Sequence, residues 1–174
     1  FLRESSGDYI IIPTKTIKKV GYLCITFSGL YTPIRNHYID SFCLTVTDGG
    51  GIYTCCNNLA GRVVSNNVIS NGIGNHEATT YAENGGAVPI YLDDHTAGVT
   101  LINNTVFNGN RYGIFLHNAH EITIVGNKIY NNAGAAAIGF AQDKLGKQDP
   151  IRNIILSGNY IFAREGSRIL ELYS

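Results

Sequence analysis

Two adjacent carboxylates, Asp93 and Asp94, end the apolar segment PIYLDD at residues 89–94. A third acid, Asp48, precedes three glycines in TDGGGIYT at residues 47–54. Hydrolysis of a glycosidic bond needs one protonated acid and one ionised carboxylate, and neighbouring acids shift their pKa values apart. These aspartates are therefore the candidate catalytic residues. Asp93 is expected to face a substrate, and Asp94 to hold or orient the corner that follows.

Each of these acids also has a structural interpretation. Asp93 and Asp94 precede the residues HTAG, where an aspartate side chain can cap a turn by accepting backbone N–H groups. Asp48 equally suits the start of a glycine-rich turn, because glycine permits unusual bends and close approach of the backbone. The sequence leaves both interpretations open.

The elements that must position these acids repeat along the chain. VVSNNVISN, TLINNTVFN, TIVGNKIYN and ILSGNYIFA each join two short apolar stretches through an asparagine. The aligned asparagines are Asn67, Asn104, Asn127 and Asn159, and His37 takes their place in an earlier copy, IRNHYIDS. A second column aligns Ile25, Ile52, Ile90, Ile114 and Ile138, of which the last three are 24 residues apart.

The repeat predicts an all-β fold, a right-handed single-chain parallel β-helix of about six rungs. Its 24 residues leave no room for the helix of a βαβ unit. The isoleucines stack inward, and the asparagines form a ladder at one corner, where Asn tolerates the bend. Insertions are expected at 72–86 and 143–152. Residues 1–174 form one domain in which 1–22 cover one end, and the uncapped last rung indicates a fragment of a longer protein or an end that another molecule covers.

Alternation of strand side chains places three columns on the outside. They are Ser28, Cys55, Asp93, His117 and Ala141; Thr26, Tyr53, Tyr91, Phe115 and Gly139; and, at the corner, Gly29, Cys56, Asp94, Asn118 and Gln142. An exposed aromatic strip beside carboxylates suits sugar rings, although β-propensity alone also explains it. The candidate substrate-binding residues are Tyr53, Tyr91, Phe115, His117, Asn118 and, from the first insertion, Glu83. These columns contain no basic residue other than His117.

The composition narrows the classes of partner. The formal net charge is zero and charged residues are 15% of the chain, which argues against a nucleic-acid or membrane-surface partner. No apolar run approaches the ~20 residues of a membrane span. The four cysteines include the adjacent pair Cys55 and Cys56, and are expected to be small buried hydrophobic residues without a disulfide framework or a zinc site.

The segments DGGGIYT, PIYLDD, GIFLHN and the N-N-x-[IV] repeats resemble bacterial parallel β-helix proteins of the pectate-lyase-like superfamily, and within it glycoside hydrolase family 141. The resemblance covers about residues 20–165. It implies that Asp48 and Asp93 or Asp94 are catalytic and that His117 lines the site. His95 stands where the family has Gly, and TCCNN replaces its usual segment after I-Y.

The resulting hypothesis is a glycoside hydrolase that acts on a polysaccharide or glycan, secreted or at the cell surface, with no metal or other cofactor. One alternative is a non-catalytic carbohydrate-binding, adhesive or tail-fibre segment. A second alternative is a polysaccharide lyase, for which acids on this face could bind Ca²⁺.

Overall fold

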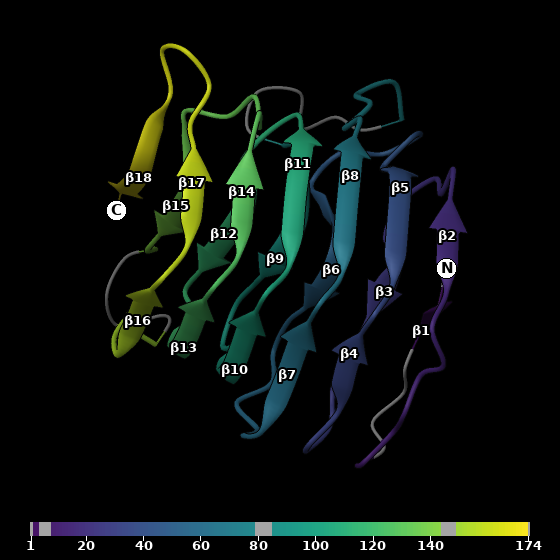
Figure 1. Cartoon of the computed structure of the whole chain (residues 1–174), viewed down its shortest axis with the longest axis vertical. Coiled ribbons are helices and arrows are strands. Elements are labelled where there is room, and N and C mark those ends of the chain that lie inside the picture. Colours follow the sequence, from purple (N-terminus) through teal and green to yellow (C-terminus); the bar gives the residue numbers. More distant parts are fainter. Residues whose placement is uncertain (1, 4–7, 79–84, 144–148, 174) are drawn as a thin grey trace.

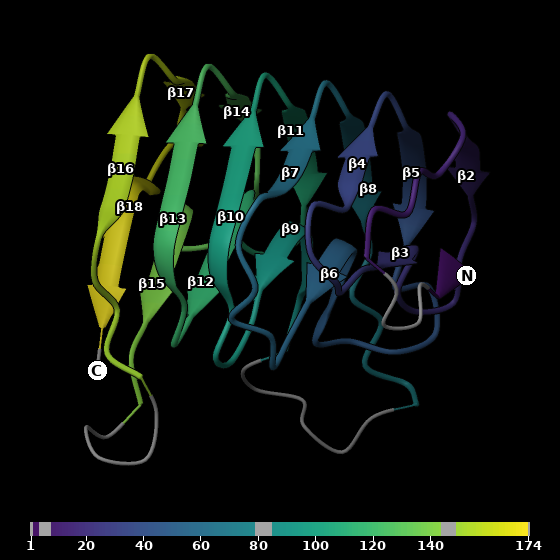
Figure 2. The same ribbon diagram turned by 90° about the horizontal axis from the view of Figure 1, so that it is seen from below.

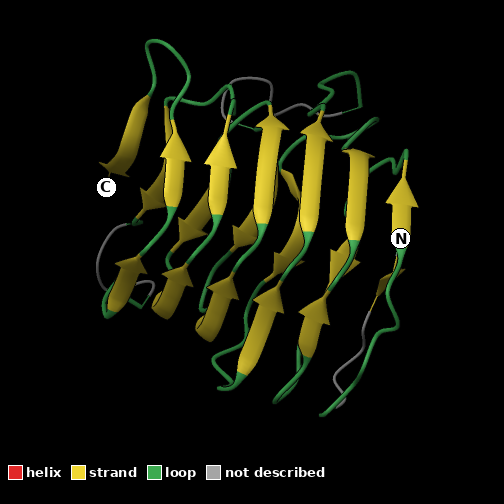
Figure 3. Cartoon of the chain, viewed as in Figure 1, coloured by secondary structure: helices red, strands yellow, loops and turns green. Residues whose placement is uncertain are grey.

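Three sheets wind around one core in the computed structural model, which describes residues 2–3, 8–78, 85–143 and 149–173 (Figure 1). Every strand pairing among these residues is parallel. They contain strands and loops but no helix (Figure 3), and hence no helix that could cross a membrane. The chain visits the sheets in rotation, as the two perpendicular views show, so the fold is the predicted parallel β-helix (Figure 2).

The strands of each sheet follow in their spatial order. The seven-stranded sheet contains β1 (Leu2–Arg3), β3 (Ile25–Thr26), β6 (Gly49–Thr54), β9 (Ala87–Leu92), β12 (Ile114–His117), β15 (Ala136–Ala141) and β18 (Arg168–Tyr173). The five-stranded sheet contains β16 (Ile154–Ser157), β13 (His120–Val125), β10 (Ala97–Ile102), β7 (Arg62–Ser65) and β4 (Pro33–Arg35). The six-stranded sheet contains β17 (Tyr160–Phe162), β14 (Lys128–Tyr130), β11 (Thr105–Gly109), β8 (Val68–Gly72), β5 (Tyr38–Phe42) and β2 (Thr16–Lys18).

The predicted isoleucine column forms the core side of the seven-stranded sheet. Ile25 pairs in register with Ile52, Ile52 with Ile90, Ile90 with Ile114, and Ile114 with Ile138, and all five are fully buried. The other two sheets supply matching columns, Ile39, Ile69, Val106 and Ile129 on one side and Ile34, Val64, Leu101 and Ile124 on the other. Removal of these side chains from water is the main stabilising contribution to the coil.

The predicted asparagine ladder is present at the corner between the five-stranded and six-stranded sheets. The Nδ2 of Asn67 donates to Asn104 Oδ1 at 2.9 Å, and Asn104 and Asn127 each donate to the next asparagine at 3.0 Å. His37 takes the next place, because its backbone N–H donates to Asn67 Oδ1 at 2.9 Å. The three central asparagines are at most 1% exposed. The polar groups around them are out of reach of water and form their hydrogen bonds with these side chains instead.

The number of rungs agrees with the sequence prediction of about six. Five complete turns run from β4–β6 to β16–β18, and β2 and β3 begin another. The two ends of the chain lie at opposite ends of the coil (Figure 1). In the last turn the side chains of Phe162 and Leu172 are 69% and 75% exposed. That another molecule or further chain covers this end stays a prediction.

Candidate active site

Asp48 lies at a bend directly before β6, whose first three residues are glycines. A Cβ atom on Gly51 would lie 2.5 Å from Ile69 Cγ2, and one on Gly50 would lie 3.0 Å from the carbonyl oxygen of Ile52. The Gly51 position leaves no room for a Cβ atom and the Gly50 position leaves little, so both favour glycine. Asp48 itself has φ 56°, and its backbone carbonyl accepts a 2.8 Å hydrogen bond from the hydroxyl of Tyr22. The bend places Asp48 beside the outer face of the seven-stranded sheet.

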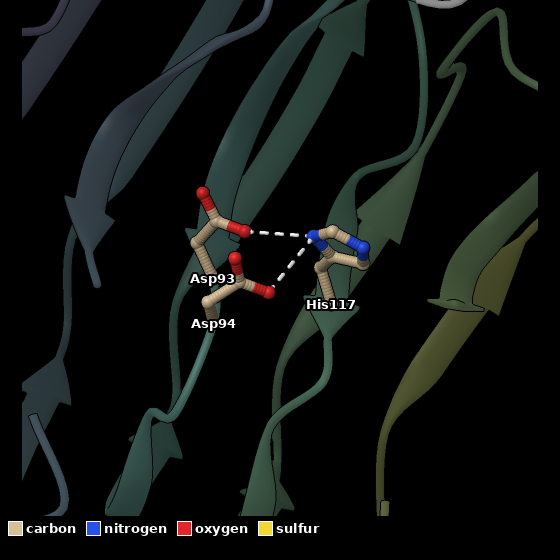
Figure 4. A group of neighbouring side chains, drawn as sticks. All are labelled: Asp93, Asp94 and His117. Carbon is tan, nitrogen blue, oxygen red and sulfur yellow. Dashed lines mark hydrogen bonds and ion pairs between the residues drawn. The ribbon is translucent and has the colours of Figure 1, made fainter. Parts of the chain in front are cut away.

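Asp93, Asp94 and His117 form a cluster on that face (Figure 4). Asp93 and Asp94 follow the end of β9, and His117 ends the neighbouring strand β12. The Nδ1 of His117 lies 2.8 Å from Asp93 Oδ1 and 3.5 Å from Asp94 Oδ1. The predicted proximity of Asp93 and His117 on adjacent rungs is therefore confirmed.

Asn118 lies at the corner beside this cluster, next to Asp94. Asn118 is fully buried, and its Nδ2 donates to Asp94 Oδ1 at 2.6 Å and to Asp143 Oδ2 at 3.1 Å. The Oδ1 of Asn118 accepts from the backbone N–H of Asp143 at 2.8 Å and from Gln142 at 2.9 Å. With its amide used in this way, Asn118 positions the two aspartates. Its predicted contact with a substrate has no support in this geometry.

Asp143 is a member of the site that the sequence columns do not include. It stands at the start of the second insertion, and its Oδ1 lies 3.4 Å from His117 Nε2. The imidazole thus lies between two carboxylates, one at each ring nitrogen. No sequence signal marks Asp143, because it lies outside the repeating columns.

The environments of Asp93 and Asp48 give the two acids opposite pKa shifts. Burial acts to raise the pKa of Asp93, but hydrogen bonds from His117 and from the Tyr53 hydroxyl outweigh it and bring the pKa below its ordinary value. Partial desolvation, together with the nearby Asp93 carboxylate, raises the pKa of Asp48. The hydrogen bond to Asp93 raises the pKa of His117 to about 9. At neutral pH the cluster therefore holds an ionised Asp93 beside an imidazolium.

A cleft of about 340 Å³ opens beside this cluster. Asp48, Tyr91, Arg111, Phe115, His117 and Asp143 contribute to its lining. Gly85, from the end of the first insertion, lies in the same wall, so the expectation that this insertion reaches the site agrees with the part of it that is described. The predicted binding residue Glu83 lies outside the described residues.

Arg111 is the basic residue that the sequence columns missed. Its guanidinium carbon lies 4.7 Å from the ring centroid of Phe115 and 5.3 Å from that of Tyr112. His117 is the only basic residue of the outward columns, and Arg111 adds a second basic group to this face from outside them. Arg111 precedes its strand and approaches the face from the turn, where the strand alternation used for the columns does not apply.

The aromatic strip has the predicted order but not the predicted exposure. Tyr53 pairs with Tyr91, and Tyr91 with Phe115, on the outer side of the sheet. Tyr91 is only 5% exposed and Phe115 only 2%, because Tyr112 stacks on Phe115 at 5.0 Å and Arg111 lies over it. Tyr53 remains partly exposed and donates to Asp93 Oδ2 at 2.7 Å. Sugar binding by the strip stays a prediction, and Tyr53 offers it the most accessible ring.

The cysteines divide into two pairs. Cys24 and Cys43 are free and fully buried, as expected. Cys55 and Cys56 form a disulfide between adjacent residues, directly below Asp93 and Asp94. The expectation of four buried thiols is therefore wrong for this pair. Their sequence adjacency gave no hint of a bond, since disulfides usually join residues that the fold brings together.

Asp93, Asp94 and His117 could also hold a divalent cation. Each offers one ligand atom, and these atoms lie within 4.8 Å of one another. Two carboxylates and an imidazole suit a transition metal better than Ca²⁺, which prefers oxygen ligands alone. These atoms already have partners, because Asp93 Oδ1 is bonded to His117 and Asp94 Oδ1 accepts from Asn118, so the cluster does not require an ion.

The chain matches no protein-family model, no curated protein and no solved structure at a significant level. The resemblance to glycoside hydrolase family 141 accordingly stays a prediction. The fold itself follows from the strand pairings of this chain.

Proposed function

We propose that this protein is a glycoside hydrolase that cleaves a polysaccharide or glycan in the cleft beside Asp93. The observation that carries the proposal is the placement of two carboxyl groups with opposite pKa shifts: Asp48 lines the cleft, and Asp93 is bonded to His117 of the same lining. Glycoside hydrolysis needs one protonated acid and one ionised carboxylate, and opposite pKa shifts favour that division.

In the proposed reaction Asp48 donates a proton to the glycosidic oxygen as the bond to the anomeric carbon breaks. Asp93 either attacks the anomeric carbon or takes a proton from the water that does. His117 and Tyr53 are positioning residues, because each holds one oxygen of Asp93. Asp94 acts one step further away, through its contacts with His117 and Asn118.

A glycan panel tests the proposal through reducing ends released by the purified chain. The Asp48→Asn and Asp93→Asn variants should each lose roughly a hundredfold to ten-thousandfold in rate. Glu165→Gln provides the matched control, because Glu165 is exposed and lies away from the cleft. Full activity in Asp93→Asn would exclude the proposed mechanism. Proton NMR of the first anomer formed would then decide between direct attack by Asp93 and attack by water.

Arg111 supports a second candidate, a polysaccharide lyase. A lyase of this fold class uses a basic residue to remove a proton from the sugar ring, and Arg111 lines the cleft together with Asp48. A lyase leaves an unsaturated product that absorbs ultraviolet light, whereas a hydrolase does not. Absorbance that grows with time and is lost in Arg111→Ala would favour the lyase. Binding of glycans without either product would favour the non-catalytic alternative.

The proposed location is secreted or at the cell surface. The Cys55–Cys56 disulfide supports it, because disulfides persist mainly in oxidising compartments.

A further inference from the structure

A smaller hollow lies over β3 and β6, next to the candidate active site. Its volume is about 170 Å³, against about 340 Å³ for the main cleft. It is lined by Thr26, Phe27, Ser28, Tyr53, Thr54 and Cys55. No charged side chain belongs to this described lining, which distinguishes the hollow from the main cleft.

One wall of the hollow is the ring of Tyr53. On one side this ring makes a T-shaped contact with Tyr91 at a centroid distance of 5.3 Å. On the other side its partner in register is Thr26, whose side chain is too small to cover an aromatic ring. The step from tyrosine to threonine in the outward column therefore leaves room against Tyr53, where the apolar face of a sugar could stack.

The remaining lining suits a sugar that carries hydroxyl groups but no charge. Thr26 and Ser28 bring hydroxyls that can donate and accept hydrogen bonds. Ser28 uses its backbone carbonyl, and not its hydroxyl, to accept from Thr32. Cys55, which is joined to Cys56 by a disulfide, adds an apolar side chain to the same lining.

Asp93 lies between this hollow and the main cleft. Its Oδ2 accepts from Tyr53, which lines the hollow, and its Oδ1 contacts His117, which lines the cleft. Rungs of a β-helix are spaced by about 4.8 Å, so a chain of sugars lying across the strands would pass from one space over Asp93 into the other.

We infer that the hollow over β3 and β6 is a subsite for a neutral sugar ring, on the opposite side of Asp93 from the main cleft. The inference deepens the proposed function and rests on it for the identity of the ligand. It implies that a substrate occupies both sides of Asp93 and that an internal bond of the chain is cut.

The test measures binding to an array of neutral linear oligosaccharides, from disaccharides to hexasaccharides. Ser28→Leu fills the hollow while it keeps the backbone carbonyl that Thr32 uses. Ser65→Leu is the matched control, since Ser65 is also a half-buried serine but lies in β7 of the five-stranded sheet. For the wild type, affinity should rise when the oligosaccharide is long enough to fill both spaces. In Ser28→Leu the affinity for these longer oligosaccharides should fall about tenfold. The affinity for the shortest ligand should not change.

A second variant guards against misfolding of the first. Thr26→Ile keeps the shape of a β-branched side chain but removes its hydroxyl, and it should reduce the same length-dependent gain. If both variants bind every length as the wild type does, the subsite is wrong even if Asp93-dependent cleavage is found. If the gain is lost in both variants but no glycan is cleaved, the subsite stands and the hydrolase fails. Absence of binding by the wild type to every oligosaccharide would overturn the subsite as well.

Discussion

The Nδ1 of His117 lies 2.8 Å from the Oδ1 of Asp93, and this contact joins two adjacent rungs of the coil at the candidate active site. The two side chains are only 23% and 17% exposed, so water screens their attraction weakly. With Asp143 near the other ring nitrogen, the protonated imidazole can donate at both ends. The geometry therefore favours an imidazolium and an ionised carboxylate together.

The first prediction concerns the pH dependence of stability. The pKa of His117 rises from 6.5 to about 9 on folding, so the folded state binds this proton more tightly than the unfolded state. The resulting stabilisation is complete below pH 6.5 and is lost as the pH rises through about 9. Its size should be on the order of 1–3 kcal/mol. Chemical denaturation at a series of pH values measures the free energy of unfolding directly.

Asp93→Asn supplies the control for this first experiment. The neutral amide keeps the shape of the side chain but removes the main cause of the raised pKa of His117. The loss of stability between pH 6.5 and 9 should become smaller in the variant. An unchanged pH profile would show that the contact does not control the protonation of His117.

The second prediction concerns the pH dependence of glycan cleavage. Asp93 must be ionised and its pKa is lowered, so activity should fall only at pH values below the ordinary aspartate value of 3.8. Asp48 must be protonated and its pKa is raised, so activity should persist above 3.8 and fall at higher pH. A bell-shaped profile of kcat/KM with an acidic optimum is expected. Activity that only increases towards alkaline pH would contradict the assigned roles.

The third prediction concerns the internal asparagine ladder. Asn104→Ala removes an amide that bonds Asn67, Asn127 and the carbonyl of Val64, all of them buried. The loss should reduce the free energy of unfolding by about 2–4 kcal/mol, because buried polar groups are left without partners. Urea denaturation of the variant against the wild type measures it.

Asn108→Gly is the matched control for the ladder. Asn108 belongs to an exposed ladder on the same strand pair, where it donates to Asn71 and accepts from Asn131. Its φ of 56° suits glycine, so the substitution adds no backbone strain. We expect a loss of under about 1 kcal/mol, since water replaces the missing contacts. Equal losses in the two variants would contradict a special role for burial.

The fourth prediction concerns the cysteines. Burial raises the pKa of Cys24 and Cys43 to about 12, so these thiols should resist alkylation in the native protein. Denaturation without a reductant should expose these two thiols alone, and addition of a reductant should bring the alkylated cysteines to all four. Mass spectrometry counts the attached groups. Four alkylated cysteines without a reductant would show that Cys55 and Cys56 are not joined.

Much of the fold could be predicted because each copy of the repeat places the same residue types in the same environment. Ile90, Ile114 and Ile138 recur at one spacing, and each buries the same face against its copies. The same regularity identified the asparagine ladder and the outward neighbours Asp93 and His117. Strand alternation determines which side chains leave the core, so the column containing Tyr53, Tyr91 and Phe115 was also assigned to the outside.

Alternation could not predict what lies over that outer face. Arg111 and Asp143 come from a turn and an insertion, whose paths depend on contacts distant in sequence. Arg111 and Tyr112, from the turn before β12, bury Phe115, while Tyr53 stays partly open, although the sequence assigns both rings to one column.

The sequence by itself determined the coil, its core and the outward direction of Asp93, because these follow from local periodicity. Only the tertiary structure decided the rest: the bend that places Asp48 at the cleft, the two carboxylates around His117, and the disulfide below them. These depend on how non-repeating segments pack across several rungs, and periodicity carries no information about such packing.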